Sequence, residues 1–340
     1  MSPSPTQQAQ LQQHAYNAIN EYFTRHSHEV VEIEILPPAL EPLEGLLLED
    51  GANLGLPKKI LALAFVRARH LFFENRHSEL PKERELALEA TRVMLLFDPE
   101  HLTAANYRKH HLLNLKGEDG VGFTSALLTE LCFLDSILTS PLHRQSKSPI
   151  LWSHRFWTLP YLIPSLHQSA SDLTGFFKSE LEAVCKSGER HPKNYYAWQY
   201  ARRVLSNVPL LQTADERDIF FDWCVTRVKD WCCQHPSDIS GWMFLAWSLP
   251  LRDTKGTGKI VRQIVEYAVS VRLANDSLWV FVRTVIANGT IRKAQAKEVV
   301  AIMLEYTDGK EHTGPTSPFH QQISKSLEWM EMNTRGGDFP

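Results

Sequence analysis

Tryptophan recurs along this chain four residues after a small polar residue, and this spacing limits the possible fold more than any other feature. The pairs are Ser148 and Trp152, Asn194 and Trp198, Asp238 and Trp242, and Asn275 and Trp279. A further copy keeps the polar residue as Asn106 but has His110 in the tryptophan position. The copies follow one another about every 40 residues, a period typical of repeats built from two helices.

The residue types in this pattern suit the start of a helix. Asn, Ser and Asp are preferred N-caps, because their side chains accept a hydrogen bond from a free amide of the first turn. Pro149 follows Ser148 directly, and proline is favoured at the first helical position. A tryptophan four residues after the cap lies one turn into the helix, where it can fill the groove between adjacent hairpins. The motif therefore predicts architecture before it predicts chemistry.

The rest of the chain agrees with a helical repeat. Apolar residues recur with a period of 3.6 from Lys58 onward, and prolines or glycines separate the segments. We predict helices near residues 11–23, 58–72, 81–97, 103–115, 123–138, 173–186, 215–233, 259–273, 293–306 and 321–332. The fold class predicted is all-α, an α/α superhelical solenoid of helical hairpins. The expected domains are an N-terminal extension, 1–57, with a helix, a strand-like segment at 30–35 and a loop, and one repeat domain, 58–335.

Composition excludes several functional classes. A net charge of -3 over 340 residues gives no basic surface typical of a nucleic-acid-binding protein. The five cysteines form no CxxC pair, which favours a reducing compartment. We expect no signal peptide, and the longest uncharged run, 156–171, contains Pro160 and Pro164 and is not expected to be a membrane span. We expect a cytoplasmic protein with no metal site of its own.

Two stretches of the chain resemble a known repeat. The segment from Asn194 to Trp198 matches the first five positions of Asn-Tyr-x-x-Trp-x-x-Arg, the repeat of protein prenyltransferase α subunits. The segment from Lys147 to Arg155 keeps the Trp-x-x-Arg half. The resemblance covers about residues 90–290. The second copy looks most like the α-subunit-repeat-containing proteins of type III geranylgeranyltransferase.

This resemblance implies a partner. In the family, the α subunit wraps around a β subunit, which holds the catalytic zinc, and the enzyme transfers an isoprenoid to a protein cysteine. It implies a β subunit similar to that of Rab geranylgeranyltransferase, geranylgeranyl transfer, and no cofactor bound by this chain. Lys147 corresponds to the lysine that meets the leaving diphosphate, so it is the expected catalytic residue. Tyr195 and Tyr196 correspond to residues near the isoprenoid diphosphate.

Departures from the family pattern leave a second hypothesis open. Pro149 occupies a tyrosine position, Tyr196 occupies a histidine position, and the motif arginine survives only as Arg155. Lys147 could equally be a solvated turn lysine, and the two tyrosines could pack on a partner protein. The alternative to an enzyme subunit is a non-catalytic helical-repeat scaffold. No phosphate loop or catalytic motif elsewhere indicates a self-contained active site.

Overall fold

A computed structural model describes residues 4–40, 42, 45–118, 120–166, 170–208, 211, 213–251, 254–307 and 317–333. The chain forms two compact units, residues 1–173 and 174–340. The boundary between them falls inside helix α8 (Ala170–Arg190). The division into residues 1–57 and 58–335 stays a prediction, and residues 334 and 335 lie outside the described ranges.

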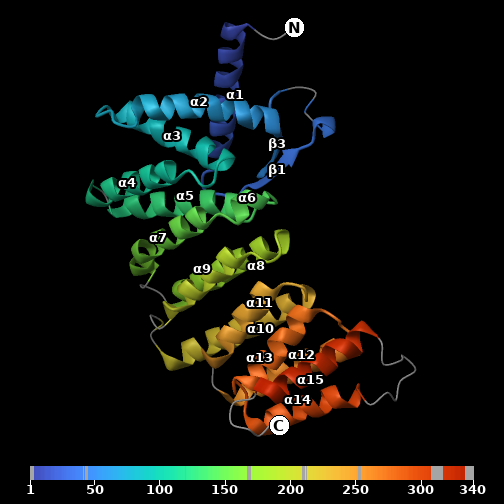
Figure 1. Cartoon of the computed structure of the whole chain (residues 1–340). Helices are drawn as coiled ribbons and strands as arrows, with labels where there is room; N and C mark the ends of the chain where they lie inside the picture. The colour runs from blue at the N-terminus through green and yellow to red at the C-terminus, as the bar shows by residue number, and fades with distance from the viewer. Residues whose placement is uncertain are drawn as a thin grey trace. The chain divides into compact units, whose positions relative to one another are not determined.

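Helices dominate unit 1, and most of them pack against their neighbours in the chain (Figure 1). They are α1 (Pro5–Arg25), α2 (Lys58–Asn75), α3 (Pro81–Phe97), α4 (Leu102–Glu118), α5 (Gly120–Leu138), α6 (His143–Ser146) and α7 (Pro149–Leu166), with a short 3-10 helix at Pro38–Leu40. Helix α2 packs on α1 and α3, and α4 packs on α3, α5 and α7. The predicted helical segments of this unit are therefore confirmed, although α1 begins earlier than expected, at a capping box formed by Ser4 and Gln7.

Unit 1 also contains a small sheet with the strand order β1-β3-β2. The strands are β1 (Glu32–Leu36), β2 (Leu48–Asp50) and β3 (Asn53–Pro57), with β1 parallel and β2 antiparallel to β3. The prediction of an uninterrupted loop up to residue 57 is wrong at β2 and β3. All three residues of β2 are exposed, so this edge strand has no apolar alternation to reveal it. In strand β3 the apolar alternation consists of only two buried leucines, Leu54 and Leu56, which is too short a pattern to indicate a strand.

The helices of unit 2 form two rows. Beyond α8 they are α9 (Tyr195–Leu205), α10 (Ala214–Gln234), α11 (Ile239–Ser248), α12 (Thr254–Ser270), α13 (Asp276–Ala287), α14 (Lys293–Glu305) and α15 (Pro318–Asn333), with a 3-10 turn at Leu249–Leu251. Helices α9, α11, α13 and α15 pack in succession in one row, and α10, α12 and α14 pack in succession in the other. Helix α10 also packs on α11, which joins the rows. This is an all-α helical-repeat fold, as the sequence period predicts.

The repeat tryptophans lie in the core. Trp152, Trp198, Trp242 and Trp279 are all buried. In unit 2 the ring of Trp198 lies 5.0 Å from that of Trp231, edge to face. Trp231 is itself held by a hydrogen bond of 3.1 Å from its indole nitrogen to the carbonyl of Cys185. Large aromatic rings thus fill the space between successive helices, which is the packing role that the motif predicts.

Two glycines allow helices to approach Trp231 closely. A methyl group at Gly188 would lie 2.9 Å from Cζ2 of Trp231, and one at Gly241 would lie 2.6 Å from Cζ3. Three cysteines, Cys185, Cys224 and Cys232, are buried in the same region, and all five cysteines are free thiols. Burial raises the pKa of the Cys185 thiol to about 12 and raises that of Cys224 further.

Candidate functional site

The residue that leads each tryptophan motif starts a helix in four of the five copies. The side-chain oxygens of Ser148, Asn194 and Asp238 accept hydrogen bonds from the backbone amides three residues later, at 3.1, 3.3 and 3.0 Å. The predicted N-caps are therefore confirmed at these three positions. Asn275 is the N-cap of α13, but its side chain makes no capping hydrogen bond.

The tryptophans add a second anchor that sequence reasoning did not predict. The indole nitrogens of Trp152, Trp242 and Trp279 donate to the backbone carbonyls six residues earlier, at 2.8, 3.0 and 2.7 Å. One of these acceptors is Pro236, a proline in the entering turn. A proline six residues before a motif tryptophan recurs in the sequence, and this spacing could have indicated the bond. Each bond ties the entering turn to the first turn of its helix. Trp198 is the exception, because its buried indole nitrogen has no hydrogen-bond partner in the described structure.

Leading residues also connect neighbouring repeats. The hydroxyl of Ser148 donates to the carbonyl of Pro99, in the turn before α4, at 3.1 Å. One carboxylate oxygen of Asp238 accepts from the backbone amide of Lys193, in the turn before α9, at 2.6 Å. These residues therefore cap one helix and hold the turn of the repeat before it.

The first copy is placed wrongly by the sequence motif. Asn106 is exposed within α4 and does not begin it. The helix begins five residues earlier, where Nδ1 of His101 accepts from the amide of Ala104 at 3.2 Å. Histidine is not among the preferred N-caps. The motif alignment therefore took Asn106, which lies in the second turn of α4, as the cap of this helix. Ala105 consequently occupies the position that tryptophan has in the other copies.

The corrected register also explains the shifted arginines. Arg155 and, in the corrected register, Arg108 occupy the motif position. Arg155 is buried and forms an ion pair of 2.7 Å with Asp135. Arg202 and Arg283 lie one residue later in their copies and stack over Trp247 and Trp329, at 5.9 and 5.2 Å. In the corrected first copy Lys109 takes the same position, and it lies 5.7 Å from the ring of Trp157. A cation on one motif helix therefore contacts an aromatic ring on the next.

Lys147, the expected catalytic residue, is the C-cap of the short helix α6. Its backbone is held on both sides, because the carbonyl of Ser146 accepts from Trp152 and Ser148 caps α7. The side chain is partly exposed. The structure thus gives Lys147 a fixed main chain on an accessible turn, while its role toward a diphosphate stays a prediction.

Tyr195 and Tyr196 lie in the first turn of α9 and are exposed, at 59% and 42% of their surfaces. Their rings pack edge to face, with centroids 5.7 Å apart. The prediction that they are not buried inside the chain is confirmed. They belong to unit 2, whereas Lys147 belongs to unit 1.

A buried polar cluster in unit 1 was missed entirely. Nε of Arg108 donates to Oε1 of Glu130 at 2.8 Å, a second guanidinium nitrogen donates to the other carboxylate oxygen, and a third donates to Thr91 at 3.1 Å. Nε2 of His154 lies 3.3 Å from Oε1 of Glu130. The residues come from α3, α4, α5 and α7, so no local spacing could indicate the cluster.

The charges in this cluster are set by burial and by the ion pair. Burial lowers the pKa of His154 to about 4, although Glu130 opposes this shift. Burial alone would raise the pKa of Glu130, but the Arg108 guanidinium beside it, aided by His154 and Arg92, holds it below its usual value. At neutral pH the cluster is therefore an arginine–glutamate pair beside a neutral imidazole, which is a structural arrangement.

No group of three or more histidine, cysteine, aspartate or glutamate side chains among the described residues is placed to hold a metal ion. Among the described helices, none is both long and apolar enough to cross a membrane.

Capped hairpins with a buried tryptophan, tied turn to turn, define an α-helical repeat protein. The relatives that the chain matches are named for prenyltransferase α-subunit repeats. The chain is 26% identical over 219 residues to protein prenyltransferase alpha subunit repeat-containing protein 1-A of Xenopus laevis, covering 58% of this chain and 46% of the relative. It is 26% identical over 260 residues to the human protein prenyltransferase alpha subunit repeat-containing protein 1, covering 72% and 60%. The resemblance seen in the repeat motif is confirmed.

Two further comparisons refine this relationship. The chain is 22% identical over 226 residues to the geranylgeranyl transferase type-2 subunit alpha of Saccharomyces cerevisiae, covering 64% of each protein. Residues 160–268 match the family described as ECM9 middle domain. The chain spans between 46% and 64% of the lengths of these three relatives.

Proposed function

We propose that this chain is the α-type subunit of a heterodimeric protein prenyltransferase, which transfers a geranylgeranyl group to a protein cysteine. Its distant homology to prenyltransferase α-type proteins, one of them named as an enzyme subunit, supports the class. The observation that carries the finer proposal is the pair of exposed tyrosines at the start of α9. Exposed aromatic rings beside a rigid, capped turn suit contact with a partner protein or its ligand.

The proposed partner is a β subunit similar to that of Rab geranylgeranyltransferase, with the isoprenoid diphosphate and the acceptor protein bound to the complex. The partner would hold zinc, which supplies a thiolate from the acceptor cysteine. In this chain, the Lys147 ammonium would face the diphosphate and stabilise the negative charge that grows on it as the isoprenoid leaves. Tyr195 and Tyr196 would donate hydrogen bonds to diphosphate oxygens or pack on the partner. The proposal places the complex in the cytoplasm, where free thiols persist.

Co-purification tests the assembly. The full chain is expressed with an affinity tag, and we expect a prenyltransferase β subunit to be retained at a fixed ratio to it. Tyr195→Ala with Tyr196→Ala should weaken retention, whereas Tyr267→Ala, a half-exposed tyrosine on α12, should not. Absence of any such subunit would refute the enzyme proposal.

Turnover tests the role of Lys147. With the complex assembled, Lys147→Ala should slow geranylgeranyl transfer about tenfold or more, because one charge-assisted contact to the leaving group is lost. Lys82→Ala, an exposed lysine at the start of α3, is the matched control and should leave transfer unchanged. Unchanged transfer in Lys147→Ala would remove this residue from the mechanism while leaving the assembly intact.

A second candidate is a helical-repeat scaffold without catalysis. The specific observation in its favour is Pro149, which follows the Ser148 cap and cannot donate the hydrogen bond of the family tyrosine. A complex that retains a partner but transfers no isoprenoid from geranylgeranyl diphosphate would favour this candidate.

A further inference from the structure

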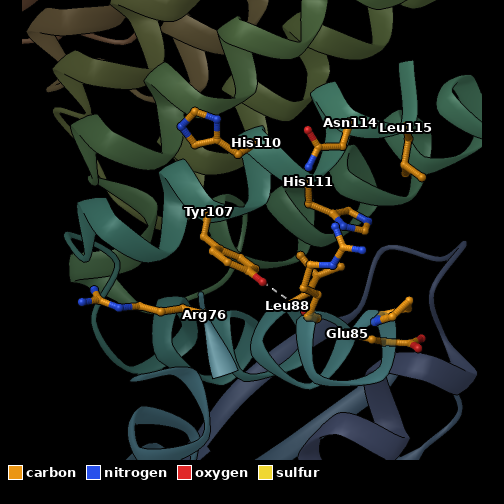
Figure 2. A pocket seen from close by; sticks show the side chains of 10 residues that line it. Arg76, Glu85, Leu88, Tyr107, His110, His111, Asn114 and Leu115 are labelled. Carbon is orange, nitrogen blue, oxygen red and sulfur yellow. Dashed lines mark hydrogen bonds between the residues drawn. The ribbon is translucent and has the colours of Figure 1, made fainter. Parts of the chain in front are cut away.

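A cavity of about 400 Å³ lies between α3 and α4 in unit 1, close to the end of α2. Figure 2 shows its lining residues, with Tyr107, His111 and Asn114 on α4 and Glu85 and Leu88 on α3. The hydroxyl of Tyr107 donates to the backbone carbonyl of Arg84 at 3.2 Å and joins the two walls. A cavity of this size suits a small organic ligand.

The polar lining is rich in hydrogen-bond donors. It comprises Arg76, Arg84, His110, His111 and Asn114, against the single carboxylate of Glu85. Within the described structure none of these five side chains makes a hydrogen bond or an ion pair, although the guanidinium of Arg76 stacks on Phe73 at 4.8 Å. Arg84, His110 and Asn114 are exposed, so the buried donor of this lining is Nε of Arg76, which has no partner in the described structure. Unpaired buried donors are rare in folded proteins.

The charges favour an anion. The lining carries two guanidinium groups and one carboxylate, so it is positive even with both imidazoles neutral. Burial, together with Arg108 and Arg84, lowers the pKa of His111, and Glu130 and Glu85 oppose this shift. The neutral imidazole still offers one N–H donor at pH 7. Phosphate has more acceptor oxygens than a carboxylate and uses more of these donors.

The remaining wall is apolar and is formed by Pro81, Leu88, Leu115 and the ring of Tyr107. An inorganic anion would leave this wall uncovered, whereas an organic group attached to the anion would cover it. We propose that this cavity binds a small organic phosphate, with Arg84 and His111 contacting the phosphate and the apolar wall contacting the organic part. Lys147 does not line the cavity, so the proposal is independent of the prenyltransferase function.

Phenyl phosphate is a suitable probe, with inorganic phosphate and benzoate as matched compounds. Calorimetric titration of the full chain should give saturable binding of phenyl phosphate, and weaker binding of both other compounds. Inorganic phosphate lacks the ring, and benzoate has fewer acceptor oxygens. No saturable binding of phenyl phosphate, or benzoate binding as tight, would overturn the proposal.

Variants locate the site. Arg84→Gln, on an exposed side chain, should weaken phenyl phosphate binding about tenfold or more through loss of a charge-assisted contact. Glu85→Gln should tighten binding about threefold, because a like charge is removed. Arg144→Gln, which removes the same charge from an exposed position outside the cavity, is the control and should bind as the parent does. Equal weakening by Arg84→Gln and Arg144→Gln would show diffuse attraction and refute the site.

The imidazole of His111 gives a readout inside the cavity. A bound phosphate dianion should raise the pKa of His111. The NMR shifts of the His111 ring protons, titrated against pH with and without phenyl phosphate, measure this change. Lys147→Ala should leave both the binding and this shift unchanged. An unmoved His111 titration at saturating phenyl phosphate would place the ligand elsewhere and contradict the proposal.

Discussion

The carboxylate of Asp238 binds the backbone amide of Lys193 at 2.6 Å, and its second oxygen caps α11 through the amide of Gly241 at 3.0 Å. Lys193 has a φ of 61°, in the left-handed region that is unfavourable for a residue with a side chain. Asp238 is 1% exposed, so water does not compete for these bonds. One buried carboxylate therefore starts a helix and stabilises a strained turn in the repeat before it.

Replacing Asp238 should cost more than the loss of an ordinary cap. Asp238→Ala removes the cap and a buried charge-assisted hydrogen bond, and we expect the free energy of unfolding to fall by about 2–4 kcal/mol. Asp238→Asn keeps an acceptor for Gly241 and should lose less. Asn275→Ala, at an N-cap with no side-chain bond, should change stability by about 0.5 kcal/mol or less. Urea unfolding measures all three, and equal losses at 238 and 275 would contradict the dual role.

Two glycines of α8 should respond to the same substitution with opposite signs. Gly188→Ala drives a methyl group against the Trp231 ring, which is fixed by its bond to Cys185, and should destabilise by about 1–3 kcal/mol. A methyl group at Gly175 would have no atom within 4 Å. Gly175→Ala should therefore stabilise the folded chain by about 0.5–1 kcal/mol through helix propensity. Thermal unfolding of the two variants tests this, and a stabilised Gly188→Ala would show that Trp231 moves freely.

The tyrosine hydroxyls of α1 offer a matched pair. The hydroxyl of Tyr16 is buried without a partner in the described structure, so Tyr16→Phe should be neutral or stabilise by up to about 1 kcal/mol. The hydroxyl of Tyr22 donates to the carbonyl of Gly51 at 3.0 Å, and Tyr22→Phe should cost about 1 kcal/mol. Denaturant midpoints compare the variants. A clear loss in Tyr16→Phe would indicate an ordered water or ligand at that hydroxyl.

Acid should destabilise unit 1 through His154. Its pKa is about 4 in the folded chain, against about 6.5 when unfolded, so below pH 6.5 the unfolded chain takes up a proton that the folded chain does not. The stability contributed by the neutral imidazole is complete above pH 6.5 and is lost as the pH falls toward 4. Between pH 7.5 and pH 5 the loss should be about 2 kcal/mol.

Urea unfolding at these two pH values measures this loss. His154→Gln removes the titrating group and should show a smaller pH dependence, even if it is less stable at pH 7.5. The lowered pKa of Glu130 gives a loss of the same sign at more acidic pH, and that part should persist in the variant. An unchanged pH dependence in His154→Gln would show that the imidazole stays accessible to water.

The fold follows from the sequence where the signal is periodic. Apolar spacing and cap–tryptophan pairs predict helices from α2 to α15, because both signals are local. Strand β2 has no buried residue, so its pairing with β3 depends on a neighbour and not on its own pattern. The misplacement of the first repeat has the same origin, since His101 caps α4 without belonging to the usual residue types.

The candidate sites were less predictable. Resemblance singled out Lys147, Tyr195 and Tyr196, and the exposure of the two tyrosines agrees with a contact surface. The cavity beside Tyr107 could not be inferred, because Arg76, Arg84 and His111 come from three segments that meet only in the folded chain. The Arg108–Glu130 pair is likewise a long-range contact. Local sequence patterns predict helices, whereas a site formed by side chains from distant segments can be identified only from the tertiary structure.

The three buried cysteines of unit 2 allow local unfolding of its helices to be detected with a thiol reagent. Cys185, Cys224 and Cys232 lie under the α8–α10 region with thiols whose raised pKa keeps them protonated and unreactive. A thiol reagent reaches them only when these helices separate. The rate of alkylation at each cysteine therefore measures how often these helices open locally. Ligands or partners that stabilise the packed repeats will lower this rate without contacting a thiol.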